Sequence, residues 1–296
     1  MGGYNVTLAR RLTVASLFRS VPWRKVLLLV SLSFLVITFV MPFYWMIISS
    51  LKRREEVFAW PVVWFPRPLL LRNYPQAWRM YDFTRFYVNT VEITGLRVVG
   101  TLLSSTCVAY AFARLAAPFK GLLFTVLLST LMLPSQVTLI PTFYVWYKLG
   151  GVNTYWPLIL PSFLGSAYYI FLLRQFFFTI PPELRDAAKI DGSSEWGILW
   201  RIFLPLSKPA LTVVAIFTFQ WSWGDLFSPL IYLPDVDRMP IAYGLYLFKG
   251  RASEGSVTYW HYIMAMSVVA IIPPLVLFFS AQKYFIQGIV MTGIKG

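Results

Sequence analysis

The sequence predicts an all-α membrane protein with six transmembrane helices. Of its 296 residues, 58% are hydrophobic and only 13% are charged, and the mean hydropathy is +0.64. Soluble domains have about 25% charged residues. The apolar residues form long runs between short polar stretches, not an amphipathic repeat. A helix needs about 20 apolar residues to cross a bilayer, and the runs that qualify are 26–50, 86–112, 121–146, 155–178, 209–233 and 259–283.

A basic N-terminal segment precedes the first run, with Arg10, Arg11, Arg19, Arg24 and Lys25. Positive residues beside a first span favour the cytoplasmic side, and an even number of spans returns the C-terminus to that side. We therefore expect a multi-pass protein of the cell membrane with both termini cytoplasmic. The expected organisation is a cytoplasmic segment over 1–25, a first transmembrane helix over 26–50, an external loop with some helix over 51–85, and a core domain over 86–296.

The formal net charge of +14 points to membrane lipid and not to nucleic acid as a partner, because the Lys and Arg residues cluster beside apolar runs. Cys107 is the single cysteine, so no intrachain disulfide and no cysteine metal site is possible. His261, the single histidine, has no partner at ligand spacing, so we expect no metal site and place it at the membrane interface. No G-x-x-x-x-G-K-[ST] loop occurs, so we expect no ATP hydrolysis by this chain alone.

The polar segment 181–205 departs from ordinary loop composition and predicts a helix, a break and a second helix. Pro182 suits a first helical turn, and Glu183 and Asp186 favour the positive helix end. Gly192 can adopt the left-handed conformation that ends a helix, and Ser193 can then cap the next one.

Each of the two predicted helices has an apolar face. On the first, small and apolar side chains form a narrow face that another protein could approach closely: Leu184, Ala187 and Ala188. On the second, helical spacing predicts a face that is made by Trp196, Leu199, Trp200 and Phe203.

This segment resembles the permease family of ATP-binding-cassette importers, whose signature is Glu-Ala-Ala, three residues, Gly, nine residues, Ile, one residue, Leu-Pro. Ala187, Ala188, Gly192, Ile202, Leu204 and Pro205 fall at those spacings. Asp186 replaces the first Glu and keeps its carboxylate. In that family the loop is a cytoplasmic coupling helix that docks in a groove of the ATPase. The resemblance thus implies ATPase-coupling roles for Glu183, Asp186, Ala187, Ala188, Asp191, Gly192, Leu204 and Pro205.

Further stretches are similar to the maltose-type carbohydrate permeases, specifically their shorter six-span partner: residues 89–90, 109–114, 132–141 and 285–296. Gly224 stands where that family usually has Asn. The resemblance implies a permease that moves a sugar or sugar-like solute and works with a second homologous permease, two ATPase subunits and an extracytoplasmic solute-binding protein. It also implies that ATP and Mg are bound by the partner ATPases and that this chain binds no cofactor.

Polar and aromatic residues within the predicted spans are candidates for the translocation path: Asn89, Gln136, Thr138, Gln220, Trp221, Trp223 and Asp225. Glu92 and Arg97 also lie in a span, and we expect them to face protein or water because a charge in mid-bilayer costs about 2.5–3.5 kcal/mol. A purely structural role is an equal alternative for each, since polar groups also join helices and aromatic residues also anchor proteins at the interface.

Two other classes of protein are alternatives. A secondary transporter or channel would use similar spans with intramembrane charges as ion sites, but it leaves the spacing in segment 181–205 unexplained. A membrane-embedded enzyme would need converging nucleophiles, acids or metal ligands. With one His, one Cys and few carboxylates within spans, the sequence offers few such groups.

Overall fold

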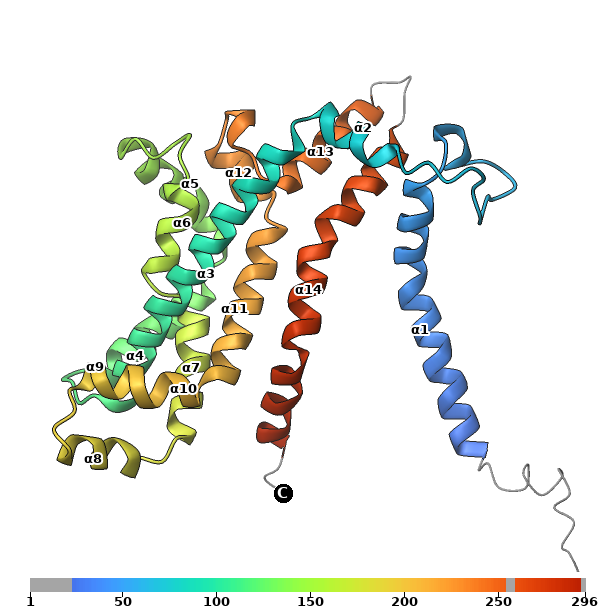
Figure 1. Cartoon of the computed structure of the whole chain (residues 1–296). Helices are drawn as coiled ribbons and strands as arrows, with labels where there is room; N and C mark the ends of the chain where they lie inside the picture. The colour runs from blue at the N-terminus through green and yellow to red at the C-terminus, as the bar shows by residue number, and fades with distance from the viewer. Residues whose placement is uncertain (1–22, 254–258, 294–296) are drawn as a thin grey trace, which may run out of the picture.

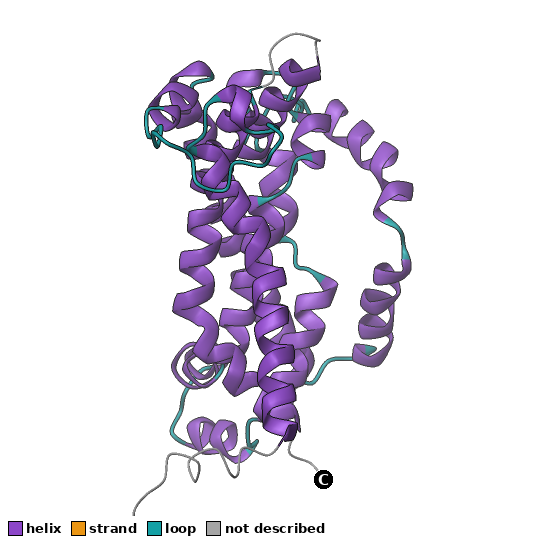
Figure 2. Cartoon of the chain, turned by 90° about the vertical axis from the view of Figure 1, so that its right-hand side faces the viewer, coloured by secondary structure: helices purple, strands orange, loops and turns teal. Residues whose placement is uncertain are grey.

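The structure is a computed structural model that describes residues 23–253 and 259–293. This part of the chain consists of helices joined by loops and contains no strand (Figures 1 and 2), so the predicted all-α class is confirmed. Most of the predicted cytoplasmic segment 1–25 lies outside the described residues, as do residues 294–296.

Four long helices run along the molecule (Figure 1): α1 (Trp23–Ser50), α3 (Phe83–Arg114), α11 (Lys208–Trp223) and α14 (Trp260–Gly293). The shorter helices are α2 (Asn73–Met80), α4 (Lys120–Ser129), α5 (Ser135–Lys148), α6 (Trp156–Phe163), α7 (Ala167–Thr179), α8 (Glu183–Ile190), α9 (Glu195–Ile198), α10 (Leu204–Leu206), α12 (Phe227–Tyr232) and α13 (Ile241–Ser253). Three 3-10 turns and one π-helical turn complete the described elements: η2 (Arg54–Glu56), η3 (Thr130–Met132), η5 (Val236–Arg238) and the π-helical η4 (Leu199–Phe203).

In the described residues, four helical stretches are long and apolar enough to cross a membrane. They are α1, α3, the α6–α7 stretch Trp156–Thr179 and the α14 stretch Trp260–Gln282. Two bent helix pairs also pass the same test together, α4–η3 with α5 and α9–α10 with α11. If each bent pair forms one span, the total is six, which equals the predicted number.

The third predicted span, 121–146, is not one helix. The α4–η3 and α5 stretches are bent by 101° at Leu133 and Pro134. Proline disfavours helical geometry in the residue before it, and Leu133 is extended, with φ −80° and ψ 115°. The fifth predicted span, 209–233, is also interrupted, because α11 ends at Trp223 and α12 begins at Phe227.

Helix α3 is the centre of the bundle and contacts α6, α7, α11 and α13. Two clusters of buried side chains lie along it. One is near its N-terminal end and contains Phe83, Phe86, Phe248 and Met266. The other lies near its C-terminal end and contains Ala109, Tyr110, Leu173, Phe177, Ile198, Phe203 and Val214.

Helix α1 stands apart from this bundle. It contacts α14 and diverges from it toward residue 23 (Figure 1). Residues 23–43 are all exposed within the chain. Since most of their side chains are apolar, this surface is suited to lipid or to another membrane protein.

The predicted external loop 51–85 contains η2 and α2, as expected of a loop with some helix. Asn73 ties α2 to the end of α1, since its Nδ2 donates to the carbonyls of Ser50 (2.8 Å) and Lys52 (2.9 Å). Lys52 is buried, with Nζ 4.0 Å from the centre of the Trp45 ring. Burial lowers the pKa of Lys52, and the carboxylate of Glu56 partly opposes this effect.

Candidate functional site

Segment 181–205 lies at one end of the bundle, where α8 is separated from the long helices (Figure 1). Helix α8 starts directly after Pro182 and has Glu183 and Asp186 in its first turn. Gly192 has a φ of +79°, so the predicted left-handed turn is confirmed. The N–H of Gly192 donates to the carbonyl of Lys189 (3.0 Å) and that of Ser193 to the carbonyl of Ala188 (2.9 Å). This is the Schellman arrangement that ends helices.

The second helix is capped by Ser194, not by the predicted Ser193. Ser194 is extended, with φ −67° and ψ 157°, and its Oγ accepts from the N–H of Gly197 at 3.1 Å. Ser193 already serves the preceding helix, because its N–H completes the Schellman turn. The cap therefore moves one residue along the chain.

The predicted apolar face of the second helix is also wrong in part. Leu199 and Phe203 are buried, but Trp196 and Trp200 are 63% and 51% exposed. Ile198 is buried in their place. The physical reason is that residues 199–203 form a π-helical turn, whose wider spacing changes which side chains share a face.

An ionic cluster that the sequence did not indicate holds the two helices together. Glu195 is its centre: Oε1 lies 2.5 Å from Nη2 of Arg185 and 2.8 Å from Nζ of Lys189. The hydroxyl of Tyr110 on α3 donates to Oε2 at 2.7 Å. The cluster thus joins α8, α9 and α3. Arg185 and Glu195 are ten residues apart and lie on either side of a turn. No helical spacing rule relates residues at that distance, so the sequence pattern does not predict their contact.

The same end of the molecule has a second polar connection. The Arg114 guanidinium, at the end of α3, donates Nη2 to the carbonyls of Phe177 (2.5 Å) and Ile180. It also lies 5.2 Å from the centre of the Phe203 ring. Arg114 therefore fixes the chain where it leaves α7 toward α8.

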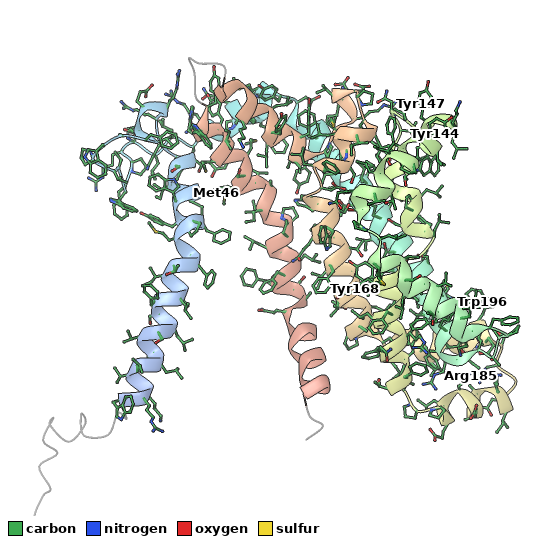
Figure 3. The ribbon with its side chains drawn as sticks, turned by 180° about the vertical axis from the view of Figure 1, so that it is seen from behind. Met46, Tyr144, Tyr147, Tyr168, Arg185 and Trp196 are labelled. Atoms are coloured by element: carbon green, nitrogen blue, oxygen red, sulfur yellow. The ribbon has the colours of Figure 1, made fainter. Side chains whose placement is uncertain are left out.

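The exposed face of α8 is apolar with an acidic rim. Leu184, Ala187 and Ile190 are exposed, with Ile190 the most open at 87%. Ala188 is only 8% exposed and packs in the buried cluster near the C-terminal end of α3, so the prediction that both alanines face outward is wrong for Ala188. The exposed acidic residues are Glu183, Asp186 and Asp191. Figure 3 shows Arg185 and Trp196 at this end of the bundle.

Leu204 and Pro205 open the short helix α10. Leu204 is partly buried and packs against the buried cluster near the C-terminal end of α3, whereas Pro205 is exposed. These two residues lie in the short helix that directly precedes α11, and a contact with an ATPase stays a prediction for both.

Three of the path candidates have structural partners in the bundle. Asn89 is buried, and its Nδ2 donates to the carbonyls of Asp237 (2.9 Å) and Met239 (3.0 Å). Trp223 is 7% exposed and donates Nε1 to the carbonyl of Ala270 at 2.9 Å. Their geometry fits the structural alternative, in which polar groups join helices and loops.

The third, Asp225, forms an ion pair with Arg97 at 3.0 Å. Its other oxygen, Oδ1, accepts from the N–H of Ser228 in the first turn of α12 at 3.1 Å. Both side chains of the pair are mostly buried. The ion pair with Asp225 agrees with the expectation that Arg97 faces protein or water. A charge away from bulk water needs such a counter-charge.

The other path candidates lie on different helices and are exposed within this chain: Glu92 on α3, Gln136 and Thr138 on α5, and Gln220 and Trp221 on α11. Their roles stay predictions. His261 is 7% exposed at the start of α14, with its ring 4.1 Å from that of Tyr262, so its side chain is buried within the chain. Its place at the membrane interface stays a prediction. No group of three or more potential metal ligands occurs among the described residues.

The sequence is similar to that of known membrane permeases. Residues 100–291 match the family described as "Binding-protein-dependent transport system inner membrane component". The "Probable ABC transporter permease protein YurM" of Bacillus subtilis is 33% identical over 86% of this chain and 83% of its own length. The "Osmoprotective compounds uptake permease protein GgtD" of Synechocystis is 31% identical over 92% of this chain and 93% of its own.

Two further similarities extend over most of the chain. The "sn-glycerol-3-phosphate transport system permease protein UgpE" of Escherichia coli is 31% identical over 91% of this chain and 97% of its own length. A chain in the crystal structure of a bacterial ABC transporter involved in the import of the acidic polysaccharide alginate has the same fold, with a TM-score of 0.79 and 23% identity. That match covers 90% of this chain and 98% of the other.

The fold and the match define the class of this protein as a membrane permease of ATP-driven importers. The chain belongs to the binding-protein-dependent transport system inner membrane component family. The resemblance that the sequence motifs suggested is thereby confirmed, as is the membrane location that the apolar runs predicted.

Proposed function

We propose that this permease moves a sugar or sugar-like solute, and that the exposed face of α8 couples its movement to ATP hydrolysis in a partner ATPase. The observation that carries the proposal is the construction of α8, whose apolar, acid-rimmed face projects at one end of the bundle while Glu195 holds its other side. The solute class is supported by the names of the relatives, which refer to sn-glycerol-3-phosphate and osmoprotective compounds.

In the proposed mechanism this chain is a two-state scaffold and supplies no catalytic residue. ATP and Mg bind to the partner ATPases, and closure of those subunits pushes on Leu184, Ala187 and Ile190 of α8. The Glu195 cluster and Arg114 then pass the displacement to α3 and α7, because rigid connections transmit movement between packed helices. The alternative, a secondary transporter or channel, gives no role to the exposed face of α8.

The deciding experiment reconstitutes the permease with its ATPases in liposomes and measures ATP hydrolysis with and without loaded solute-binding protein. We expect hydrolysis that rises on addition of the loaded binding protein and that needs the permease. Uptake that follows an ion gradient and persists without ATP would favour the secondary transporter instead. A panel of sugars, polyols and their phosphodiesters, tested first for binding to the solute-binding protein, identifies the solute.

We expect a second, homologous permease in the same assembly, since one α8 face can engage only one of two ATPase subunits. The exposed and mostly apolar stretch 23–43 of α1 and the bent α4–α5 pair offer surface for it. Affinity purification from the native host, followed by intact-complex mass spectrometry, should give two different permeases with two ATPases. An assembly with identical copies of this chain as its only permeases would overturn this expectation.

The topology that we propose puts residues 1–25, segment 181–205 and the C-terminus in the cytoplasm, with residues 51–85 outside. A Cys107→Ser background removes the single native thiol. In that background, Asp191→Cys, at the exposed residue directly after α8, should react with a membrane-impermeant maleimide only after the cells are opened. The matched control, Phe58→Cys in the loop between α1 and α2, is 69% exposed and should react in sealed cells. The reverse labelling pattern would contradict the topology.

A further inference from the structure

The connection between α1 and α2 exposes aromatic and apolar side chains, and we call its residues 58–69 the aromatic loop. Trp60 is 90% exposed and Phe65 is 74% exposed, and Phe58 and Leu69 are also open. The loop projects from the end of α1 on the side away from α14 (Figures 1 and 3). An exposed apolar patch of this kind marks a contact with a membrane or with another protein.

The aromatic loop is fixed at its base. The N–H of Leu70 donates to the carbonyl of Leu51 at 2.9 Å, so the chain returns to the end of α1. Asn73 in α2 adds its two hydrogen bonds to the carbonyls of Ser50 and Lys52. The loop is therefore held against α1, and its contacts with that helix define the level at which it lies.

These contacts show that the loop folds back along α1. The hydroxyl of Tyr44 donates to the carbonyl of Trp64 at 2.9 Å. The rings of Trp45 and Trp64 lie 6.0 Å apart, edge to face. Since α1 ends at Ser50 and a helix rises about 1.5 Å per residue, Trp64 lies roughly 9 Å back from that end, toward the middle of α1.

The apolar stretch of α1 indicates where the membrane surface lies. Residues 23–43 are exposed and mostly apolar, and at about 1.5 Å per residue they extend over roughly 30 Å. This length equals the thickness of the hydrocarbon core of a bilayer. Tyr44 and Trp45 follow directly, at the level of the interface, where tyrosine and tryptophan are enriched. Trp64, which contacts both, lies at the same level.

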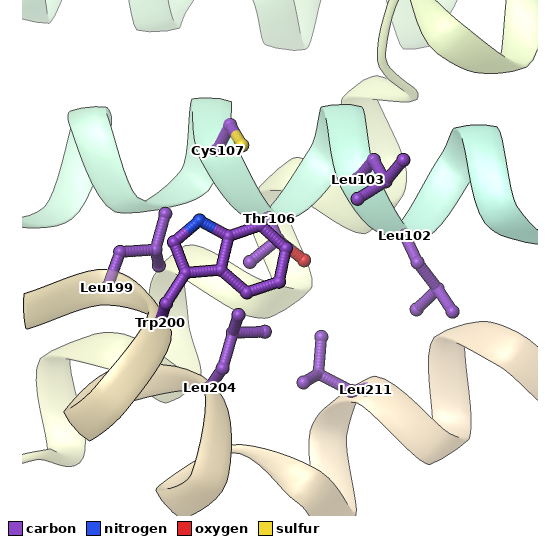
Figure 4. Close-up of a pocket in the computed structure, with 8 residues that line it drawn as sticks. All are labelled: Leu102, Leu103, Thr106, Cys107, Leu199, Trp200, Leu204 and Leu211. Atoms are coloured by element: carbon purple, nitrogen blue, oxygen red, sulfur yellow. The ribbon is translucent and has the colours of Figure 1, made fainter. Parts of the chain in front are cut away.

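Exposure alone does not identify such a contact. Trp200 is half exposed at the other end of the molecule, but it forms one wall of an apolar cavity of about 180 Å³ against α3 (Figure 4). Packing within the chain therefore explains its position. Phe65, by contrast, directly follows Trp64 in the chain, so its level relative to the membrane follows from the length of α1.

We propose that the aromatic loop lies in the lipid headgroup region at the C-terminal end of α1 and anchors this helix to the membrane surface. The rings of Trp60 and Phe65 enter the interface, and the exposed Arg67 binds lipid phosphate through paired hydrogen bonds. A soluble partner outside the membrane would meet the end of α1 first, whereas the loop is folded back toward the bilayer. The proposal requires only that α1 crosses the membrane. It is independent of the solute and of coupling at α8.

The test measures how deep the loop lies in the complete importer, reconstituted in liposomes. Single cysteines in the Cys107→Ser background carry a bimane fluorophore, which is quenched either by a lipid with a nitroxide on its headgroup or by iodide in the water. At Trp60→Cys and Phe65→Cys we expect lipid quenching several-fold stronger than at the control Val236→Cys. Val236 is exposed in η5, between α12 and α13, and its probe should be quenched mainly by iodide.

A second measurement tests the contribution of one ring. With the fluorophore at Leu69→Cys, Trp60→Ser should reduce quenching by the headgroup nitroxide several-fold. Trp60→Tyr should preserve it, because tyrosine is also suited to the interface. The matched control is Trp156→Ser, which removes an exposed tryptophan at the start of α6 and should leave the quenching at position 69 unchanged.

Two results would overturn the proposal. One is iodide quenching at positions 60 and 65 as strong as at position 236, without quenching by the headgroup nitroxide. The other is a photoreactive residue at position 60 that cross-links to the second permease or to the solute-binding protein in place of lipid. Membrane abundance and gel filtration establish that each variant is folded and assembled. ATP-driven uptake by the unlabelled importer is measured separately, so failure of this proposal is distinguishable from failure of the proposed function.

Discussion

Gly192→Val is expected to abolish most solute uptake while the protein stays in the membrane at normal abundance. Gly192 has a φ of +79°, which costs a residue with a β-carbon about 1–2 kcal/mol. No atom lies within 4 Å of the position that a Cβ would occupy, so the cost arises from the backbone and not from a clash. Relaxing the turn breaks the Schellman hydrogen bonds and redirects α8. A shift of 1–2 kcal/mol changes the population of the correct turn by about 5–30-fold.

Two matched variants make this result specific. Gly192→Asn should retain more uptake, because Asn tolerates the left-handed conformation better than a β-branched residue. Gly121→Val introduces the same side chain at an equally open position in α4 without positive φ, and it should leave uptake near normal. The measurements are uptake, co-purification of the ATPase and membrane abundance. Normal uptake by an abundant Gly192→Val protein would remove the main support for α8 as the coupling element.

Glu195→Ala is expected to uncouple ATP hydrolysis from uptake. The carboxylate contacts Arg185, Lys189 and Tyr110, and hydrogen bonds to charged groups contribute about 1.5–3 kcal/mol each. Glu195 is one-third exposed, so the lower end of that range applies. Its removal also leaves the Arg185 guanidinium, which is 18% exposed, without its nearest counter-charge. We therefore expect α8 to lose its fixed position relative to α3.

The control for this prediction is Glu55→Ala in η2, far from α8 in the sequence, which removes an exposed carboxylate that forms no ion pair with any described residue. Tyr110→Phe deletes one of the three contacts and should give an intermediate loss. The ratio of solute transported to ATP hydrolysed, in liposomes at several salt concentrations, is the measurement. A normal ratio for Glu195→Ala would mean that the cluster only stabilises the fold.

The motif in segment 181–205 could be predicted because its residues act locally. Pro182 and Gly192 restrict the backbone of their own turn, so the start of α8 and the left-handed turn that ends it follow from the residues themselves. The Ser193 cap is wrong by one position because Ser193 still belongs to the Schellman turn that ends α8, and the extended residue that precedes the second helix is Ser194. The burial of Ala188 and the exposure of Trp200 depend on contacts with α3 and on the π-helical turn, and neither has a sequence signature.

For the candidates for the translocation path, too, the sequence indicates which residues are unusual, and the tertiary contacts show what they do. The type of residue identified Arg97 and Asp225 as unusual within apolar runs, but their separation of 128 residues hides that they pair. The amide of Asn89 within an apolar run makes it a candidate for the path, and the tertiary structure shows that this amide holds the loop at Asp237 and Met239. Gln136, Thr138 and Trp221 are exposed within this chain. Their roles therefore depend on which solute, lipid or partner subunit contacts them in the assembly.

The sequence by itself determined that this protein lies in the membrane, that it is helical and that it belongs to the importer permeases. These properties depend on composition, run length and the spacing of a short motif, which are all readable along the chain. Only the tertiary structure decided the 101° bend at Pro134 and the Glu195 cluster. The angle of a bend and the meeting of distant side chains are set by packing between helices, and packing is a property of three-dimensional neighbours.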